Sequence, residues 1–332
     1  MTRNLSTAIT SLASKDRFAP EDVIMLRREI FGDGIVMREE AEALFRLEDS
    51  PVEKCPEWSA FFVEAMTDYI VHQAQPSGYI SAENAEWLIG SVSNAGAVNS
   101  PANLELLVKV LEEAKFAPES LAGFALEQVR QAVVEGKGPL MQDDGPAPGR
   151  VTKEEVELLR RILYAFAGNG NVAITRSEAD VLFAINDATA EAKNDPTWND
   201  LFVKAVANFV LCASGYEAPT RQEALRHDDF FARADADIGG FFARMVSGGV
   251  QGILESYRPT TNVDADWEAR NRSNEARSRL AETIDSGEAK WLADRIGHDR
   301  VLHENEQALL TFIKRSSPDI HPDLKPLLDR VA

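Results

Sequence analysis

The sequence predicts an all-α protein of two tandem duplicated helical lobes, and three observations support this fold class. The stretch Asp22–Leu47 returns, lengthened by a few residues, at Glu155–Ile185, which indicates an internal duplication. Apolar residues in both stretches recur at the spacing of a helix that is buried on one face. Prolines, acids and glycines stand where such helices would begin and end. We therefore expect helix-turn-helix hairpins as the building unit.

The first hairpin of lobe 1 begins with a helix that starts at Pro20 and ends near Phe31. Glycines at positions 32 and 34 break this helix, and a second helix is expected over Arg38–Glu48. The apolar residues of the second helix share one face, which we expect to be buried: Ala41, Leu44, Phe45 and Leu47.

The rest of lobe 1 consists of one long helix and a second hairpin. A broad apolar stripe follows Pro56, and we expect it to form the centre of the first core. The second hairpin begins with Ser81 as a helix cap and turns at residues 94–98. Its next helix starts at Pro101, and a last helix starts at Pro118.

Lobe 2 repeats the large aromatic residues of lobe 1. Trp198 matches Trp58 at the start of the long helix, and Trp291 matches Trp87 in the following hairpin. The second match lies much further along the chain than in lobe 1. We therefore expect lobe 2 to be interrupted by a helical insertion at residues 217–283.

The predicted domain organisation follows from these matches and from a segment rich in proline and glycine between the two copies. The chain is expected to contain a flexible N-terminal arm at 1–18, lobe 1 at 19–135, a linker at 136–151 and lobe 2 at 152–332.

Composition and charge restrict the possible partners. The chain has 332 residues, of which 44% are hydrophobic, and a formal net charge of −19. This charge disfavours nucleic acid and anionic membrane surfaces. The two cysteines stand outside any metal or redox motif, and no apolar stretch is long enough to span a membrane. We expect a cytoplasmic protein that binds neither nucleic acid nor membrane.

The four hairpin turns share a short pattern, at residues 33–36, 95–98, 171–174 and 298–301. A turn is followed by one branched apolar residue in extended conformation and then by a helix start. In this respect the units resemble the second half of an EF-hand loop. The first turn, DGIVMREE, is also similar to the turn of tellurite-resistance TerB-like helical domains.

The resemblance to EF-hands would imply calcium binding, and the first turn offers the candidate ligands Glu29, Asp33 and Glu40. Calcium requires six or more oxygen ligands, and the acids spaced two apart in an EF-hand are missing here. A structural turn is the alternative. His298 and His303 are a second, separate metal candidate, because they would meet around one helical turn.

The branched residues of the turns also predict contacts. We expect Val36 to lie beside Val98 in lobe 1, and Ile174 beside Val301 in lobe 2. Each pair would exchange backbone hydrogen bonds as a minimal antiparallel ladder.

The insertion carries the strongest interaction signal. Its residues 238–257 form an apolar helical stripe, and the opposite face bears Gly239, Gly240, Arg244, Gly248 and Gly252. Glycine lowers helix stability, so close approach by another backbone is the expected compensation. The helix therefore either packs within its own domain or binds a partner or a second copy of the chain.

The sequence favours a non-catalytic role. It contains no nucleophile with its base, no metal cluster and no phosphate-binding loop at a recognisable spacing, so we expect no catalytic residues and no cofactor. A protein-protein interaction or regulatory module is the preferred interpretation, with a protein partner or self-association. The alternatives are a calcium-responsive sensor and an enzyme whose site lies between the lobes.

Overall fold

The computed structural model describes residues 12, 15–30, 36–141, 148–165, 174–211, 286–296, 301–316 and 321–331. The predicted insertion at 217–283, with Gly239, Gly240, Arg244, Gly248 and Gly252, lies outside these residues, and so does Asp33. In the described ranges, strands are confined to one short hairpin and two isolated bridges, which confirms the all-α fold class. No helix in these ranges has the length and apolarity needed to cross a membrane.

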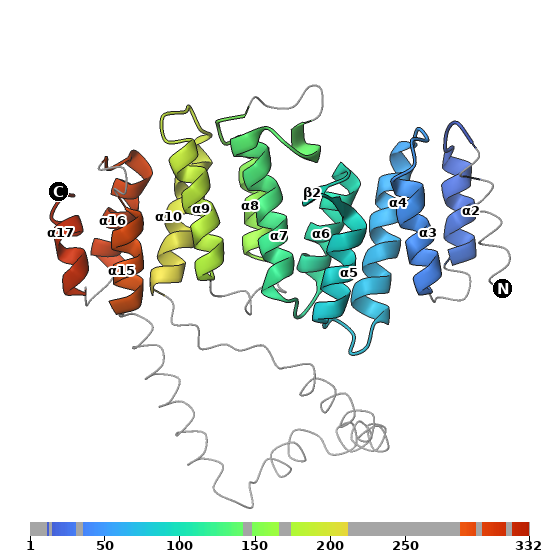
Figure 1. The fold of residues 1–332 in the computed structure, drawn as a ribbon, viewed down its shortest axis with the longest axis horizontal. Helices are drawn as coiled ribbons and strands as arrows, with labels where there is room; N and C mark the ends of the chain where they lie inside the picture. Colours follow the sequence, from blue (N-terminus) through green and yellow to red (C-terminus); the bar gives the residue numbers. More distant parts are fainter. Residues whose placement is uncertain are drawn as a thin grey trace, which may run out of the picture.

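Figure 1 shows the helices side by side in one elongated row, from α2 at one end to α17 at the other. The first half contains α2 (Pro20–Ile30), α3 (Arg38–Glu48), α4 (Pro56–Thr67), α5 (Ala82–Val92), α6 (Pro101–Glu113) and α7 (Glu119–Arg130). The second half contains α8 (Lys153–Leu163), α9 (Arg176–Ala188), α10 (Pro196–Leu211), α15 (Ser286–Arg295), α16 (Glu304–Ser316) and α17 (Lys325–Leu328). Short π or 3-10 segments are η1 (Asp68–Gln73), η2 (Gln131–Glu135), η3 (Pro139–Met141) and η5 (Pro322–Leu324).

The row has two layers. Helices α2, α4, α6, α8, α10 and α16 contact one another in succession and form one layer. Helices α3, α5, α7 and α9 contact one another in succession and form the other. Such an array, in which each unit contacts mainly its neighbours, is typical of solenoid proteins.

Helix starts lie where proline and serine predict them. Pro20, Pro56 and Pro101 each occupy the first position of their helix, where the missing N–H removes no helical hydrogen bond. The Ser81 hydroxyl accepts a hydrogen bond from the Asn84 amide at 3.1 Å and caps α5, as predicted. These local signals mark the helix starts.

The turn after α5 is a β-hairpin, which the sequence did not predict. Strand β1 (Ser93–Asn94) pairs with β2 (Ala97–Val98), and Val98 lies opposite Ser93. The two turn residues have positive φ, 51° at Ala95 and 82° at Gly96. Positive φ at both central positions is the geometry of a two-residue hairpin turn.

The two halves share one hydrophobic core. One core cluster includes residues from Leu12 to Val331, and α6 and α7 contact α8 and α9 directly. Arg161 on α8 reinforces the junction, because its guanidinium forms ion pairs with Glu105 and Glu112 on α6, each at 2.7 Å. Residues 136–151 therefore connect two halves that pack against each other.

The aromatic residues form the same cluster in each half. Phe45 meets Phe62 edge to face at 5.5 Å, and its counterpart Phe183 meets Phe202 edge to face at 5.1 Å. Phe45 also meets Trp87 at 5.7 Å and 81°, and Phe183 meets Trp291 at 5.5 Å and 82°. Trp58 and Trp198 are both buried. This geometry agrees with the residue matches in the sequence, while the common origin of the halves stays a prediction.

The predicted pairing of the turns is wrong. The amide of Val36 donates to Gln73 Oε1 at 2.7 Å, and that of Val98 donates to Gln128 Oε1 at 2.9 Å. The Ile174 amide donates in the same way to Asn208 Oδ1 at 2.8 Å, and the Val301 side chain is 51% exposed. A side-chain amide on a later helix thus satisfies each of these three turn amides, so the ladder between turns is not needed.

The N-terminal arm is shorter than predicted. Phe18 is buried and its ring lies 5.0 Å from that of Trp58, while its amide donates to the Glu53 carbonyl at 2.8 Å. Burying an aromatic ring in the core fixes the chain at this point. The segment from Lys15 to Phe18 therefore belongs to the folded unit.

Candidate functional site

The predicted calcium ligands do not come together in the described part of the chain. Glu40 Oε2 accepts a hydrogen bond from the Met37 amide at 2.9 Å and caps the start of α3. Glu29 is exposed on α2, and Asp33 lies outside the described residues. No group of three or more metal-ligating side chains is found in the ranges given above. The calcium-sensor alternative stays a prediction.

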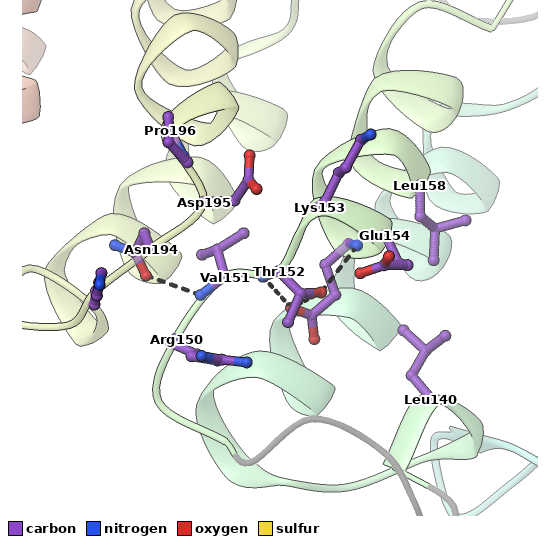
Figure 2. Close-up of a pocket in the computed structure, with 12 residues that line it drawn as sticks. Leu140, Arg150, Val151, Thr152, Lys153, Glu154, Leu158, Asn194, Asp195 and Pro196 are labelled. Carbon is purple, nitrogen blue, oxygen red and sulfur yellow. Dashed lines mark hydrogen bonds between the residues drawn. The ribbon is translucent and has the colours of Figure 1, made fainter.

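Two hollows lie on either side of the segment that joins α9 to α10, which they share at Lys193, Asn194, Asp195 and Pro196. The first hollow has a volume of about 730 Å³ and is bounded by the start of α8 and by Leu140 of η3. The second has a volume of about 490 Å³ and is bounded by the end of α9 and the start of α16. Figure 2 shows the first hollow.

Hydrogen bonds hold the walls of the first hollow in place. The Val151 amide donates to Asn194 Oδ1 at 2.8 Å, which ties the start of α8 to the joining segment (Figure 2). The Asp195 amide returns a hydrogen bond to the Val151 carbonyl at 2.9 Å. Thr152 and Glu155 form a capping box at the start of α8, and the amide and hydroxyl of Thr152 both donate to Glu155 Oε2.

The charged side chains around the first hollow differ in whether they already have partners within the protein. Glu155 is buried and engaged in the capping box. The hydroxyl and amide of Thr197 donate to Asp195 and lower the pKa of its carboxyl group. Arg150, Lys153 and Lys193 are exposed and form no ion pair within the described ranges. The hollow therefore offers cationic hydrogen-bond donors, while two of its acids are satisfied within the protein.

Three asparagine side chains that line the second hollow are joined by hydrogen bonds. Asn199 Nδ2 donates to Asn305 Oδ1 at 2.6 Å, and Asn305 Nδ2 donates to Asn186 Oδ1 at 2.7 Å. These hydrogen bonds link α10, α16 and α9 beside the hollow. His303, at the edge of the hollow, caps α16, where its amide donates to Glu306 Oε2 at 2.9 Å. Its predicted metal partner His298 lies outside the described residues.

Two buried donors in this hollow have no hydrogen-bond partner in the described part of the chain, Trp198 Nε1 and Asn186 Nδ2. Both residues line the hollow, and each is only 1% exposed. Buried donors are nearly always paired in folded proteins, so an unpaired one is a sign of a further interaction. The second hollow therefore holds two of the unpaired buried polar groups of the described residues, the others being on Thr67 and Asn103.

Sequence reasoning placed the interaction site on the insertion and missed both hollows. The cations of the first hollow come from segments that the fold brings together, so no local motif marks them. The second hollow had a detectable signal. Asn186 stands where the first copy has Glu48, in the middle of otherwise matched residues, and this exchange is visible when the copies are aligned.

Comparison of the chain with known proteins gives no relative from which a role could be transferred. No family model matches it, and neither the curated proteins nor the solved structures contain a match. The proposals below therefore rest on the residues of this chain.

Proposed function

We propose that the chain is a non-catalytic protein-protein interaction module of the cytoplasm, and that it holds an acidic segment of a partner protein in the first hollow. The proposal rests on one observation. Arg150, Lys153 and Lys193 surround a hollow of about 730 Å³ with their cationic groups exposed and not engaged in ion pairs within the described ranges. Carboxylates are the natural acceptors for such groups.

The charge of the whole chain makes this hollow selective. With a net charge of −19, most of the surface repels an acidic segment, so attraction is restricted to places where cations gather. Glu154 also lines the hollow and opposes an acidic ligand, so binding depends on the placement of carboxylates beside the cations. We expect the interaction to weaken as salt concentration rises.

The elongated form of the molecule supports an interaction role. A two-layered row of helices exposes long faces relative to its core, and solenoid proteins use such faces to bind extended ligands. The proposal therefore combines a scaffold suited to extended partners with one hollow whose chemistry selects acidic ones.

The insertion remains a second predicted contact element. Gly248 and Gly252 are expected to admit the backbone of a partner, as proposed from the sequence. A chain lacking 217–283 would still join α10 to α15 through residues 212–216, 284 and 285, much as residues 74–81 join η1 to α5 in the first half. This deletion separates the contribution of the insertion from that of the hollow.

Charge reversal tests the proposal. The full chain and the R150E/K153E/K193E variant are used to capture proteins from the native cell, and we expect the variant to lose the protein that the unchanged chain retains. The matched control is R28E/R46E/R330E, which makes the same change of net charge at exposed arginines outside the hollow. Equal capture by both variants, or equal loss in both, contradicts a contact at this hollow.

A further inference from the structure

We propose that the second hollow, at Asn186 and Trp198, binds a carboxylate group. The carboxylate would complete hydrogen bonds that a carboxylate of the protein itself completes at the matching place in the first half. This inference does not depend on the partner contact at the first hollow, because the purified chain and a small carboxylate suffice to test it.

The first half shows the completed arrangement. Glu48 ends α3 and accepts one hydrogen bond on each carboxylate oxygen. Trp58 Nε1 donates to Oε2 at 2.5 Å, and Ser100 Oγ donates to Oε1 at 2.6 Å. Glu48 is 7% exposed and Trp58 is 0% exposed, so the hydrogen bond between the carboxylate and the indole N–H is buried.

The second half keeps the tryptophan and replaces the carboxylate. Trp198 packs against Phe202 at 5.8 Å, as Trp58 packs against Phe62 at 6.2 Å. Asn186 presents an NH₂ donor where Glu48 has an acceptor oxygen. The indole N–H and this NH₂ are consequently both donors, and neither has a partner in the part of the chain that the structure describes. Leaving buried donors unpaired is destabilising, and an acceptor from outside would remove the penalty.

The donors and the space above them specify the ligand. An indole N–H and an amide NH₂ only donate, so the ligand must accept, and a carboxylate brings two acceptor oxygens on one group. The hollow measures about 490 Å³, far more than the roughly 30 Å³ that one water occupies. Lys193 lines it and favours an anion, while Asp195 and Glu304 line it and oppose one. His303 also lines it, with Nδ1 4.0 Å from Glu191 Oε1. We therefore expect selectivity for a singly charged carboxylate over multiply charged anions.

The carboxylate has two possible sources, a small free carboxylate or the acidic side chain of a polypeptide. Acetate represents the first source. N-acetyl-glutamate methylamide represents the second, and its neutral analogue, N-acetyl-glutamine methylamide, has nearly the same shape without the negative charge.

The indole N–H signals of the five tryptophans provide the measurement. In ¹⁵N-labelled full chain, W198F identifies the Trp198 signal by its loss. We expect acetate to move the Trp198 signal saturably, with sodium chloride at equal ionic strength as the control, and the Trp58 signal to stay in place. A response to acetate alone identifies a small carboxylate as the ligand. A response to the glutamate derivative as well, but not to the glutamine derivative, identifies an acidic side chain.

The variant N186E would supply the missing carboxylate from the chain itself. This variant has a glutamate near the end of α9, as Glu48 stands at the end of α3. We expect the new carboxylate to accept a hydrogen bond from the Trp198 N–H. The response to acetate should then disappear, and the melting temperature should rise. The reciprocal variant E48N opens the first site, and its Trp58 signal should then respond to acetate.

Three results would overturn the proposal. The first is a Trp198 signal that does not move with acetate in the unchanged chain. The second is an N186E variant that is folded and responds to acetate as the unchanged chain does. The third is an atomic-resolution or neutron structure of the unliganded chain in which the Asn186 amide presents its oxygen to the Trp198 indole, because no external acceptor would then be needed.

Discussion

Glu178 is a buried acid whose protonation bears on stability. It is 7% exposed at the start of α9, where its carboxylate accepts the Thr175 amide at 2.7 Å. Burial raises the pKa of Glu178, and the nearby charge of Glu119 raises it further. The ionised form is therefore less favourable in the folded chain than in the unfolded chain.

We expect E178Q to be more stable than the unchanged chain at neutral and higher pH. The glutamine keeps an acceptor oxygen for Thr175 and removes the buried charge. Because the folded pKa lies above the unfolded one, the stability that protonated Glu178 contributes is lost as pH rises through the folded pKa. The melting temperature of E178Q should exceed that of the unchanged chain by a margin that grows as pH rises. At low pH the two melting temperatures should coincide. A variant that melts lower than the unchanged chain at pH 8 would contradict this.

At the scale of elements, the β1–β2 hairpin depends on one side chain of α7. Gln128 is 2% exposed, and its Oε1 accepts the Val98 amide at 2.9 Å while its Nε2 donates to the Gly96 carbonyl at 3.2 Å. We expect Q128A to destabilise the protein by roughly 1–3 kcal/mol, because it leaves the Val98 amide buried without an acceptor. Hydrogen exchange at Val98 should accelerate.

Q128E is the matched control for this prediction, since it keeps an acceptor for Val98 and loses the Nε2 donor to the carbonyls of Gly96 and Phe124. We expect Val98 exchange to stay slower in Q128E than in Q128A. Equal exchange rates in the two variants would show that the side chain does not hold the hairpin.

The elements that could be predicted from sequence are those with local signals. The helix that begins at Arg38 and ends at Glu48 was predicted with these bounds, and the prolines and Ser81 marked other starts correctly. The turn contacts could not be predicted in the same way, because the acceptors Gln73, Gln128 and Asn208 lie about thirty or more residues along the chain. No feature of the neighbouring sequence distinguishes these three acceptors from exposed polar residues.

The candidate site was less predictable than the fold. Arg150 and Lys193 are far apart in sequence and share a hollow only because Val151 is tied to Asn194. To predict the second hollow, Asn186 would have to be compared with Glu48. This comparison is informative only if the two halves are aligned residue by residue. The predicted contact residues of the insertion lie outside the described residues and stay a prediction.

At the scale of the whole molecule, the continuous core predicts cooperative unfolding. Since α6 and α7 contact α8 and α9, we expect one main thermal transition in place of two independent ones. R161M removes the ion pairs to Glu105 and Glu112 at this junction and should broaden or split the transition. The Arg161 side chain is 35% exposed, so the loss of stability should be only about 1 kcal/mol and should shrink at high salt.

R38M provides a comparison, because Arg38 pairs with Glu42 inside α3 and lies over the Trp87 ring of α5 at 4.4 Å, both away from the junction. Its transition should keep its width. Two well-separated transitions in the unchanged chain would contradict a continuous core.

Zero-length cross-linking measures the proposed partner contact most directly. A carbodiimide joins a lysine amine only to a carboxylate in direct contact with it, so treatment of the full chain with its captured partner should link Lys153 or Lys193 to aspartate or glutamate of that partner. Lys325, which is exposed and lies outside the hollow, serves as the internal control. The proposed function predicts intermolecular links concentrated at Lys153 and Lys193. Links to the partner that avoid both lysines, in a complex that persists at the same salt concentration, would contradict it.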